Sequence, residues 1–283
     1  MINNKYKNSV FTMLFSDPAL LRELYCALGG VSLPPDAPVT INTLENALFM
    51  GQYNDISFEI GGKLVVLVEH QSTVNPNMAA RLLMYAGRVY EKIIDVQSMY
   101  SKKRVPIPRP EFFVLYNGTD PFPDNEIYRL SDSFEELKDL GLEEKDNFAL
   151  ELVVRIININ EGRNQVIVNR CKKLAEYGAF VSKTRVFMNE LNDKEEALKE
   201  AIKYCEKHGI LREFLKENAS EVLSMLFAEF NLDDALAVRY EEGREEANFT
   251  VARNALAKGS TPEFVHEITG LDFDTIKKIQ AES

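Results

Sequence analysis

Two carboxylates and one amide stand in a single short stretch, residues 53–71, with the sequence YNDISFEIGGKLVVLVEHQ. Asp55 lies near its start, and Glu69 and Gln71 lie near its end. Carboxylate oxygens are the hard ligands that Mg²⁺ and Mn²⁺ prefer in proteins. The chemistry open to these residues therefore depends on whether the chain folds back on itself and brings the two acids together.

The sequence pattern predicts that it does, as a β-hairpin. Polar and apolar residues alternate in both arms, which is the period of a half-buried strand. Gly61 and Gly62 supply the turn, where they adopt positive φ without steric cost. A three-residue loop over 61–63 gives one wholly apolar face, on which the pairs are Ile60 with Leu64, Phe58 with Val66 and Ile56 with Val68.

The same register places Asp55 opposite Glu69, with Gln71 on the same face. A two-residue loop would instead place Asp55 opposite Val68 and mix the two faces, which a buried sheet resists. Directly paired side chains have Cβ atoms about 4.5–5.5 Å apart. Two like charges at that separation raise a pKa or recruit a cation. The hairpin therefore predicts a divalent-metal site for Mg²⁺ or Mn²⁺.

An acid, a β-turn and then Glu-x-Lys on the next strand is the motif of the PD-(D/E)XK nucleases. Here Asn54 stands in place of Pro and Gln71 in place of Lys. With this variant, the tract EHQSTVNPNMAARLLMYAGRVYEK resembles the recombination-promoting nuclease (Rpn) family, also called PD-(D/E)XK nuclease family transposases. The likeness extends to KNSVFTMLFSD, LYNGTDPFPD and EEGREE, and so covers most of the chain.

The resemblance implies a restriction-endonuclease-like α/β core, in which a central mixed sheet is flanked by helices. It implies that Asp55, Glu69 and the backbone carbonyl of His70 hold the metal. Glu45 is a candidate third acid, although a solvated surface charge is an equally good interpretation. Gln71 would take the place of the catalytic lysine; its amide can orient water but cannot act as a base.

A helix is predicted to follow the hairpin over residues 76–97, with Asn75 as its cap and Pro76 at its first position. Arg81, Tyr85 and Arg88 fall at i, i+4 and i+7, on one face of that helix. In the fold that the resemblance implies, this helix lies near the metal, so these side chains are candidates to bind DNA phosphates. The alternative is a surface arginine above a packed tyrosine.

The remaining core elements are predicted from hydrophobic periodicity. Two short helices broken at Asp17–Pro18, a central strand over 112–116 and a strand over 150–159 are followed by helices over 165–177 and 179–189. The region from 155 to 185 is rich in Lys and Arg, and would form a groove if these side chains shared a face. Residues 1–190 are thus predicted to form the nuclease-like domain.

The rest of the chain is predicted to be helical. Residues 191–240 form a helical extension, with helices over 195–208, 211–218 and 220–230, and residues 241–283 form an acidic linker and a short helical tail. Residues 240–246 are a solvated helix or linker, and short helices follow over 251–258, 262–269 and 272–280. Amphipathic helices without strand signals either pack on the core or pair with another subunit, so we expect a homo-oligomer through this part.

Composition narrows the class of protein. The net charge is −11, of which residues 191–283 carry −8 (12 Lys and Arg against 20 Asp and Glu). This argues against a uniformly basic DNA-coating surface, while the near-neutral front part can still hold a basic groove. The three cysteines and three histidines are scattered, which predicts reduced thiols and makes a zinc site improbable. With no long apolar run, a cytoplasmic protein without membrane contact is expected.

The function predicted from these features is a Mg²⁺-dependent DNA endonuclease that hydrolyses phosphodiester bonds and is linked to recombination or mobile elements. The alternative is a catalytically weak or inactive member of the same fold that binds DNA or regulates a partner, and that self-associates.

Overall fold

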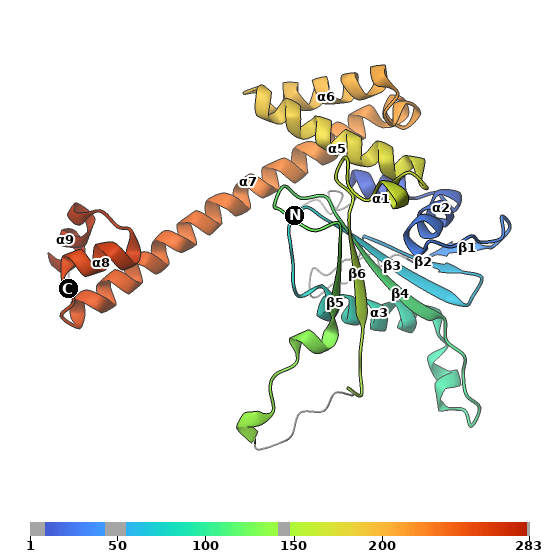
Figure 1. Ribbon diagram of the computed structural model, residues 1–283, viewed down its shortest axis with the longest axis horizontal. Helices are drawn as coiled ribbons and strands as arrows, with labels where there is room; N and C mark the ends of the chain where they lie inside the picture. The colour runs from blue at the N-terminus through green and yellow to red at the C-terminus, as the bar shows by residue number, and fades with distance from the viewer. Residues whose placement is uncertain (1–8, 43–54, 141–147, 282–283) are drawn as a thin grey trace. The chain divides into compact units, whose positions relative to one another are not determined.

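The computed structural model describes residues 9–42, 55–140 and 148–281 (Figure 1). In these described residues a six-stranded sheet has the order β1-β2-β3-β4-β6-β5. The strands are β1 Val39–Ile41, β2 Ile56–Ile60, β3 Leu64–Gln71, β4 Arg109–Tyr116, β5 Asn125–Arg129 and β6 Val153–Asn158. Strands β3, β4 and β6 run parallel and the other neighbours are antiparallel. This mixed sheet with helices, followed by a helical region, confirms the predicted α/β class.

The hairpin between β2 and β3 has the predicted register, with Ile56 opposite Val68 and Ile60 opposite Leu64. Gly61 and Gly62 have φ values of 58° and 65°, a region that residues with a Cβ rarely adopt. Because side chains alternate along a strand, Glu69 and Gln71 face one side of the sheet and His70 faces the other.

Helix α3, Met78–Ile93, covers the Glu69 face of the sheet. Its buried side chains pack on those of β3, β4 and β6 in one core cluster. The helix begins two residues later than predicted: Asn77 is its N-cap, and Asn75 Oδ1 accepts from the N–H of Asn77 at 2.9 Å. The predicted start at Pro76 was wrong because Asn75 uses its side chain to close a turn before the helix.

The opposite face is covered by α1 Val10–Leu14, α2 Pro18–Gly29 and α5 Lys172–Glu190 (Figure 1). The predicted break between the first two helices is confirmed, and Asp17 caps α2 by accepting from two backbone N–H groups. The central position of β4, predicted from its apolar run, is also confirmed.

Three details of this region differ from the prediction. Strand β5 was missed, and the helix predicted over 165–177 is a short α4, Gln165–Val168, followed by α5. The break predicted near Gly178 is absent because α5 runs through it. A Cβ at Gly178 would lie 2.7 Å from the carbonyl oxygen of Ile159, so the glycine permits close packing and does not end a helix.

Helix α6, Lys194–His208, confirms the helix predicted over 195–208; Asp193 is its N-cap and Gly209 its C-cap. It packs on α5, where the rings of Phe187 and Tyr204 lie 5.8 Å apart. Separate helices were predicted over 211–218, 220–230 and 251–258. This prediction was wrong, because one helix, α7 Arg212–Ala257, runs through these stretches and through 240–246. The lone glycine in that stretch is tolerated within a helix. The described residues also include the short 3₁₀ helices η2 Val96–Tyr100, η3 Leu130–Ser133 and η4 Lys138–Leu140.

The chain divides into two compact units between Leu226 and Phe227. In the second unit, α8 Pro262–Thr269 and α9 Phe273–Ala281 pack with the end of α7, through Ala252, Val265, Ile276 and Ile279. The domain limits at 190 and 240 stay a prediction. None of the helices in the described part of the chain has the length and the apolar composition needed to cross a bilayer.

Candidate active site

The two acids of the hairpin lie side by side at its open end. Asp55 directly precedes β2, and its backbone N–H donates to Glu69 Oε1 at 3.0 Å. The backbone N–H of His70 donates to Asp55 Oδ2 at 2.6 Å. Each carboxylate is therefore held by a backbone group of the opposite arm, and both are directed to the same end of the hairpin.

Burial makes this pair electrostatically unusual. Glu69 is only 3% exposed, and burial together with the charge of Asp55 raises its pKa well above the ordinary range. Burial also raises the pKa of Asp55 to about 6, although the hydrogen bond from His70 and the charge of Arg81 act in the opposite direction. Two negative charges here are thus poorly compensated, a condition that a bound cation relieves.

Arg81, on the second turn of α3, supplies positive charge to the pair. Its Nη2 lies 3.6 Å from Glu69 Oε2 and donates to the hydroxyl of Tyr85 at 3.0 Å. Burial opposes the guanidinium charge, but the hydrogen bond to Tyr85 and the two acids outweigh burial and raise the pKa of Arg81. The Arg81 side chain remains 34% exposed, whereas Tyr85 is buried, so Arg81 presents its charge to solvent on a fixed support.

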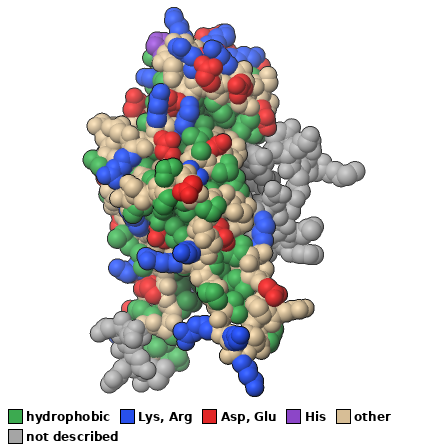
Figure 2. All heavy atoms as spheres, turned by 90° about the vertical axis from the view of Figure 1, so that its right-hand side faces the viewer, with side chains coloured by type: hydrophobic (Ala, Val, Ile, Leu, Met, Phe, Trp, Pro, Cys, Tyr) green, Lys and Arg blue, Asp and Glu red, His purple; other side chains and the backbone are tan. Residues whose placement is uncertain are grey.

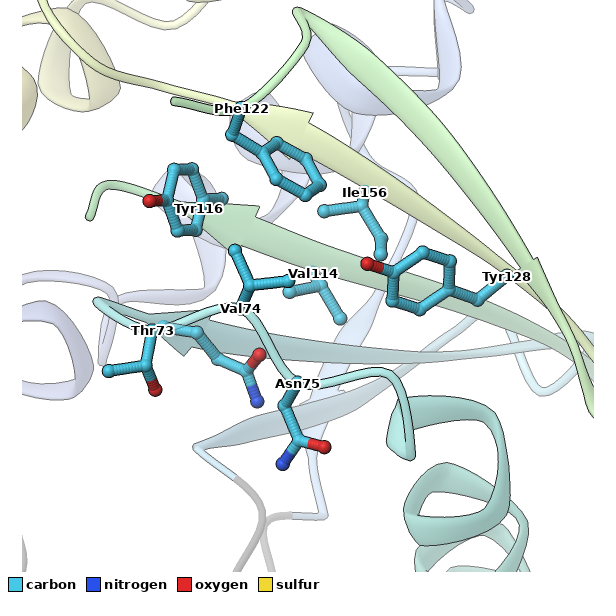
Figure 3. Close-up of a pocket in the computed structure, with 9 residues that line it drawn as sticks. Thr73, Val74, Asn75, Val114, Tyr116, Phe122, Tyr128 and Ile156 are labelled. Atoms are coloured by element: carbon cyan, nitrogen blue, oxygen red, sulfur yellow. The ribbon is translucent and has the colours of Figure 1, made fainter. Parts of the chain in front are cut away.

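Gln71 shares the Glu69 face but has a different neighbour. Its side-chain nitrogen lies 2.7 Å from Met78 Sδ, at the start of α3. Beside it is a recess with an aromatic and aliphatic wall (Figure 3), lined by Gln71, Thr73, Val74, Asn75, Val114, Tyr116, Phe122, Tyr128 and Ile156. The amide therefore borders both the acid pair's face of the sheet and an apolar wall.

The third candidate on α3, Arg88, lies seven residues beyond Arg81, or about 10 Å along the helix. Its Nη1 is buried and has no hydrogen-bond partner among the described residues. The structure thus brings Arg81 and Tyr85 to the acids and places Arg88 further along α3. Glu45 lies outside the described residues.

A contact that the sequence did not predict supports the hairpin from the opposite face. The His70 ring stacks on Phe11 at 5.2 Å, and its Nε2 lies 3.1 Å from the hydroxyl of Tyr177. Burial, with a contribution from Arg185, lowers the pKa of His70 to about 4, against a hydrogen bond to Asn117 that raises it. The only sequence signal was strand alternation, which turns His70 away from Glu69.

Asparagines at the carboxyl ends of β4 and β6 were also missed. Asn160 donates to the carbonyl of Gly118 and to Asn158 Oδ1, both at 3.0 Å, and accepts from Arg185 at 3.3 Å. These bonds fix the loop that follows β4, whose Asn117 donates its backbone N–H to the Gln71 carbonyl at 2.9 Å. The available signal was polar residues directly after two apolar strands.

The described donors suit a hard cation. One oxygen of each carboxylate accepts from a backbone N–H, and the second oxygen of Glu69 lies 3.6 Å from Arg81 Nη2. In a strand, the N–H and C=O of one residue point to the same neighbour, so the carbonyl of His70 faces the Asp55 side. Two carboxylates and a carbonyl form an oxygen donor set that fits Mg²⁺ or Mn²⁺. The described residues contain no cluster of three or more His, Cys, Asp or Glu side chains that could bind a metal.

The basic region over 155–185 does not act as one group. Arg155 lies over the ring of Phe113, Arg163 pairs with Asp124, and Lys183 lies over the ring of Tyr204. Lys172 and Lys173 both pair with Glu176. These cations thus contact different partners, and a groove over 155–185 stays a prediction.

A comparison of the chain with known protein families gives a match over the part that contains the hairpin and α3. Residues 51–173 match the family model described as "Putative transposase, YhgA-like". No match was found among curated proteins or among solved structures. The matched residues contain Asp55, Glu69, Gln71 and Arg81, and this part of the chain is thus similar to the YhgA-like (Rpn family) putative transposases, which confirms the resemblance predicted from the motif.

Proposed function

We propose that the protein is a Mg²⁺-dependent (or Mn²⁺-dependent) endonuclease that hydrolyses phosphodiester bonds of DNA. The observation that carries this proposal is the convergence of two acids with raised pKa values, the partly exposed Asp55 and the buried Glu69, beside the partly exposed Arg81. The transposase description of the matching family supports DNA as the substrate and a role in recombination or mobile elements.

In this proposal Asp55, Glu69 and the carbonyl of His70 hold the cation. When bound, Mg²⁺ supplies a Lewis acid that lowers the pKa of water and neutralises charge that develops on the phosphate. Arg81 binds a non-bridging phosphate oxygen through its exposed edge, while Tyr85 holds the guanidinium plane. The positive charge of Arg81 then offsets the negative charge of the two acids and the negative charge that develops on the phosphate in the transition state.

Gln71 takes the position of the family's lysine and orients the attacking water through its amide oxygen or nitrogen. Because an amide cannot accept the proton at neutral pH, the proton passes to solvent or to a phosphate oxygen of the substrate. We therefore expect a slower enzyme than one with an amine at this position.

One observation favours a second candidate function, a weak or inactive member that binds DNA or regulates a partner. The Gln71 amide lies against Met78 Sδ, and Arg81 already compensates part of the charge of Glu69. The first feature occupies the amide that would orient water, and the second reduces the demand for a cation. Self-association through the helical C-terminal part belongs to this candidate and is tested by sedimentation of the full chain.

The deciding experiment measures nicking of supercoiled plasmid by the full chain with Mg²⁺, Mn²⁺ or EDTA. Asp55→Asn and Glu69→Gln each keep the acceptor oxygen for the opposite backbone N–H, so both variants should fold. We expect metal-dependent nicking by the parent and none by either variant. Nicking that persists in both variants refutes the proposed site, and salt-sensitive DNA binding without nicking by the parent supports the second candidate.

A further inference from the structure

Positive charge is concentrated in a part of the chain next to the acid pair. Residues 72–110 contain seven Lys and Arg against two Asp and Glu, a net charge of +5 in a chain of −11. These cations lie along α3, on the loop that leads from η2 to β4, and at the first residue of β4. Figure 2 shows Lys and Arg side chains gathered at the lower end of the molecule, where Figure 1 shows this loop.

The first part of this positive region is a row on α3. Arg81, Arg88 and Lys92 stand at i, i+7 and i+11, so they project within about 20° of one line along the helix. The only acid of the helix, Glu91, is displaced by about 80° from that line. The row begins at the acid pair and ends near the loop, because the Tyr90 hydroxyl donates to the carbonyl of Pro108 at 2.7 Å.

The second part is the loop itself, residues 96–108, which carries no acid. Lys102, Lys103 and Arg104 are exposed. Tyr100 is 88% exposed, with Met99 at 56% and Ile107 at 52%. Asp95 accepts from the N–H of Gln97 and so fixes the start of η2. A tyrosine ring is therefore presented to solvent on an ordered turn, next to three cations.

We infer that this loop is a second nucleic-acid contact, which binds an unpaired strand of the substrate. The ring of Tyr100 stacks on an exposed base, while Lys102, Lys103 and Arg104 bind the adjacent phosphates. Aromatic rings beside cations are the general means of binding single strands. A paired base inside a duplex is already covered on both faces, so the ring selects DNA with an unpaired segment. A positive loop attracts DNA and acidic protein surfaces alike, but the exposed ring of Tyr100 adds a stacking surface that fits a base.

The structure also sets the spacing. Arg81 and Lys92 are eleven residues, or about 17 Å, apart along α3. At about 3.4 Å per nucleotide this corresponds to about five phosphates. This inference deepens the proposed function, because the acid pair defines the cleaved bond: the substrate carries its unpaired segment at least about five nucleotides from that bond.

The test measures binding by fluorescence anisotropy with full-length protein that carries Glu69→Gln, in Mg²⁺. The probes are a labelled duplex with a single-stranded extension and a blunt duplex of the same base pairs. Four proteins are compared with this parent: Tyr100→Ala, Tyr100→Phe, the triple variant Lys102→Ala, Lys103→Ala and Arg104→Ala, and a control. The control removes three exposed lysines of α6 and so makes the same change in net charge: Lys199, Lys203 and Lys207, each to Ala.

We expect Tyr100→Ala to weaken binding of the extended DNA about tenfold and that of the blunt duplex less than twofold. Tyr100→Phe should bind as the parent does, because it keeps the ring. The loop triple variant should lower the slope of log affinity against log salt by about 2 for the extended DNA. The α6 control should change neither affinity more than twofold.

Equal losses on both DNAs, no loss with Tyr100→Ala, or equal effects of the two triple variants would overturn the inference. Preferential sedimentation of the protein with anionic vesicles, abolished by Tyr100→Ala, would also overturn it by identifying a membrane surface as the partner. If plasmid nicking depends on Asp55 and Glu69 while Tyr100→Ala binds like the parent, only this inference fails. If the Glu69→Gln parent binds neither DNA and the protein with the native Glu69 does not nick plasmid, the proposed function fails as well.

Discussion

The backbone N–H of Asp55 donates a hydrogen bond to Glu69 Oε1 at 3.0 Å. One acid therefore fixes the backbone that carries the other, and the close approach of the two charges is built into the pairing of the strands. Substitution by the matching amide removes a charge and keeps the acceptor oxygen. Charge and geometry can thus be tested separately at this site.

Asp55→Asn should stabilise the metal-free protein at high pH. The pKa of Asp55 is raised from 3.8 to about 6, so the native state binds its proton more tightly than the unfolded state. The free energy of unfolding therefore falls as pH rises from about 4 through 6. Removing the acid should raise it by on the order of 1–3 kcal/mol at pH 8 and change it little at pH 4.

Urea denaturation in EDTA at both pH values measures this effect. Adding Mg²⁺ at pH 8 should then raise the melting temperature of the parent more than that of Asp55→Asn, because ligand binding to the native state is stabilising. A variant that loses stability at pH 8, or gains as much from Mg²⁺ as the parent, would contradict the electrostatic account of the pair.

Arg81→Ala should have the opposite dependence on pH. Arg81 lowers the pKa values of both Asp55 and Glu69, and without it both rise further. We expect a loss of about 1–2 kcal/mol in the free energy of unfolding at pH 8 and a smaller loss at pH 5, where protonated acids need no partner. Arg163→Ala is the matched control, because it breaks an exposed pair with Asp124 at 3.0 Å. Its effect should stay below about 1 kcal/mol.

Gln71→Lys should retain or increase plasmid nicking. The ammonium group adds a positive charge on the Glu69 face of the sheet, where it lowers the pKa of the buried acid and, under the proposed function, stabilises the transition state. Gln71→Met, which matches the length of the side chain but offers no donor, should fold and lose most activity. Complete loss of nicking by Gln71→Lys, in a protein with an unchanged melting temperature, would show that the amide makes a contact that an amine cannot.

Gly118→Ala should severely destabilise the protein. A Cβ at this position would lie 2.1 Å from the carbonyl oxygen of Ser72 and 2.4 Å from the hydroxyl of Tyr116. Since backbone must move to make room, we expect a loss of about 3 kcal/mol or more. Gly87→Ala is the matched control in the exposed face of α3, where no atom lies within 4 Å. Thermal or urea unfolding should show a gain of about 0.5–1 kcal/mol for this variant.

The hairpin and its acids could be predicted from sequence because their determinants are local. Alternation fixed which residues face the core, and the glycine turn fixed the register, so Asp55 and Glu69 had to meet. Helical spacing from the same tract placed Arg81 beside Tyr85. Each of these relationships spans fewer than twenty residues.

Other features depend on distant parts of the chain and carry no periodic signal. The support of His70 by Tyr177 joins residues 107 positions apart. Strand β5 has an exposed, irregular pattern because it forms the sheet's edge. A glycine such as Gly178 usually predicts the end of a helix. Its close packing against the carbonyl oxygen of Ile159 explains why a glycine is present although the helix continues.

The separation of fourteen positions between Asp55 and Glu69 also bears on how the chain folds. A loop this short closes at small entropic cost, and hairpins form in about 1–10 μs. Arg81 reaches the acids only after α3 has docked, so repulsion acts on the nascent hairpin before its compensating cation arrives. We therefore expect refolding to accelerate as the solution is acidified toward pH 5, even though α3 contributes nothing to that first encounter.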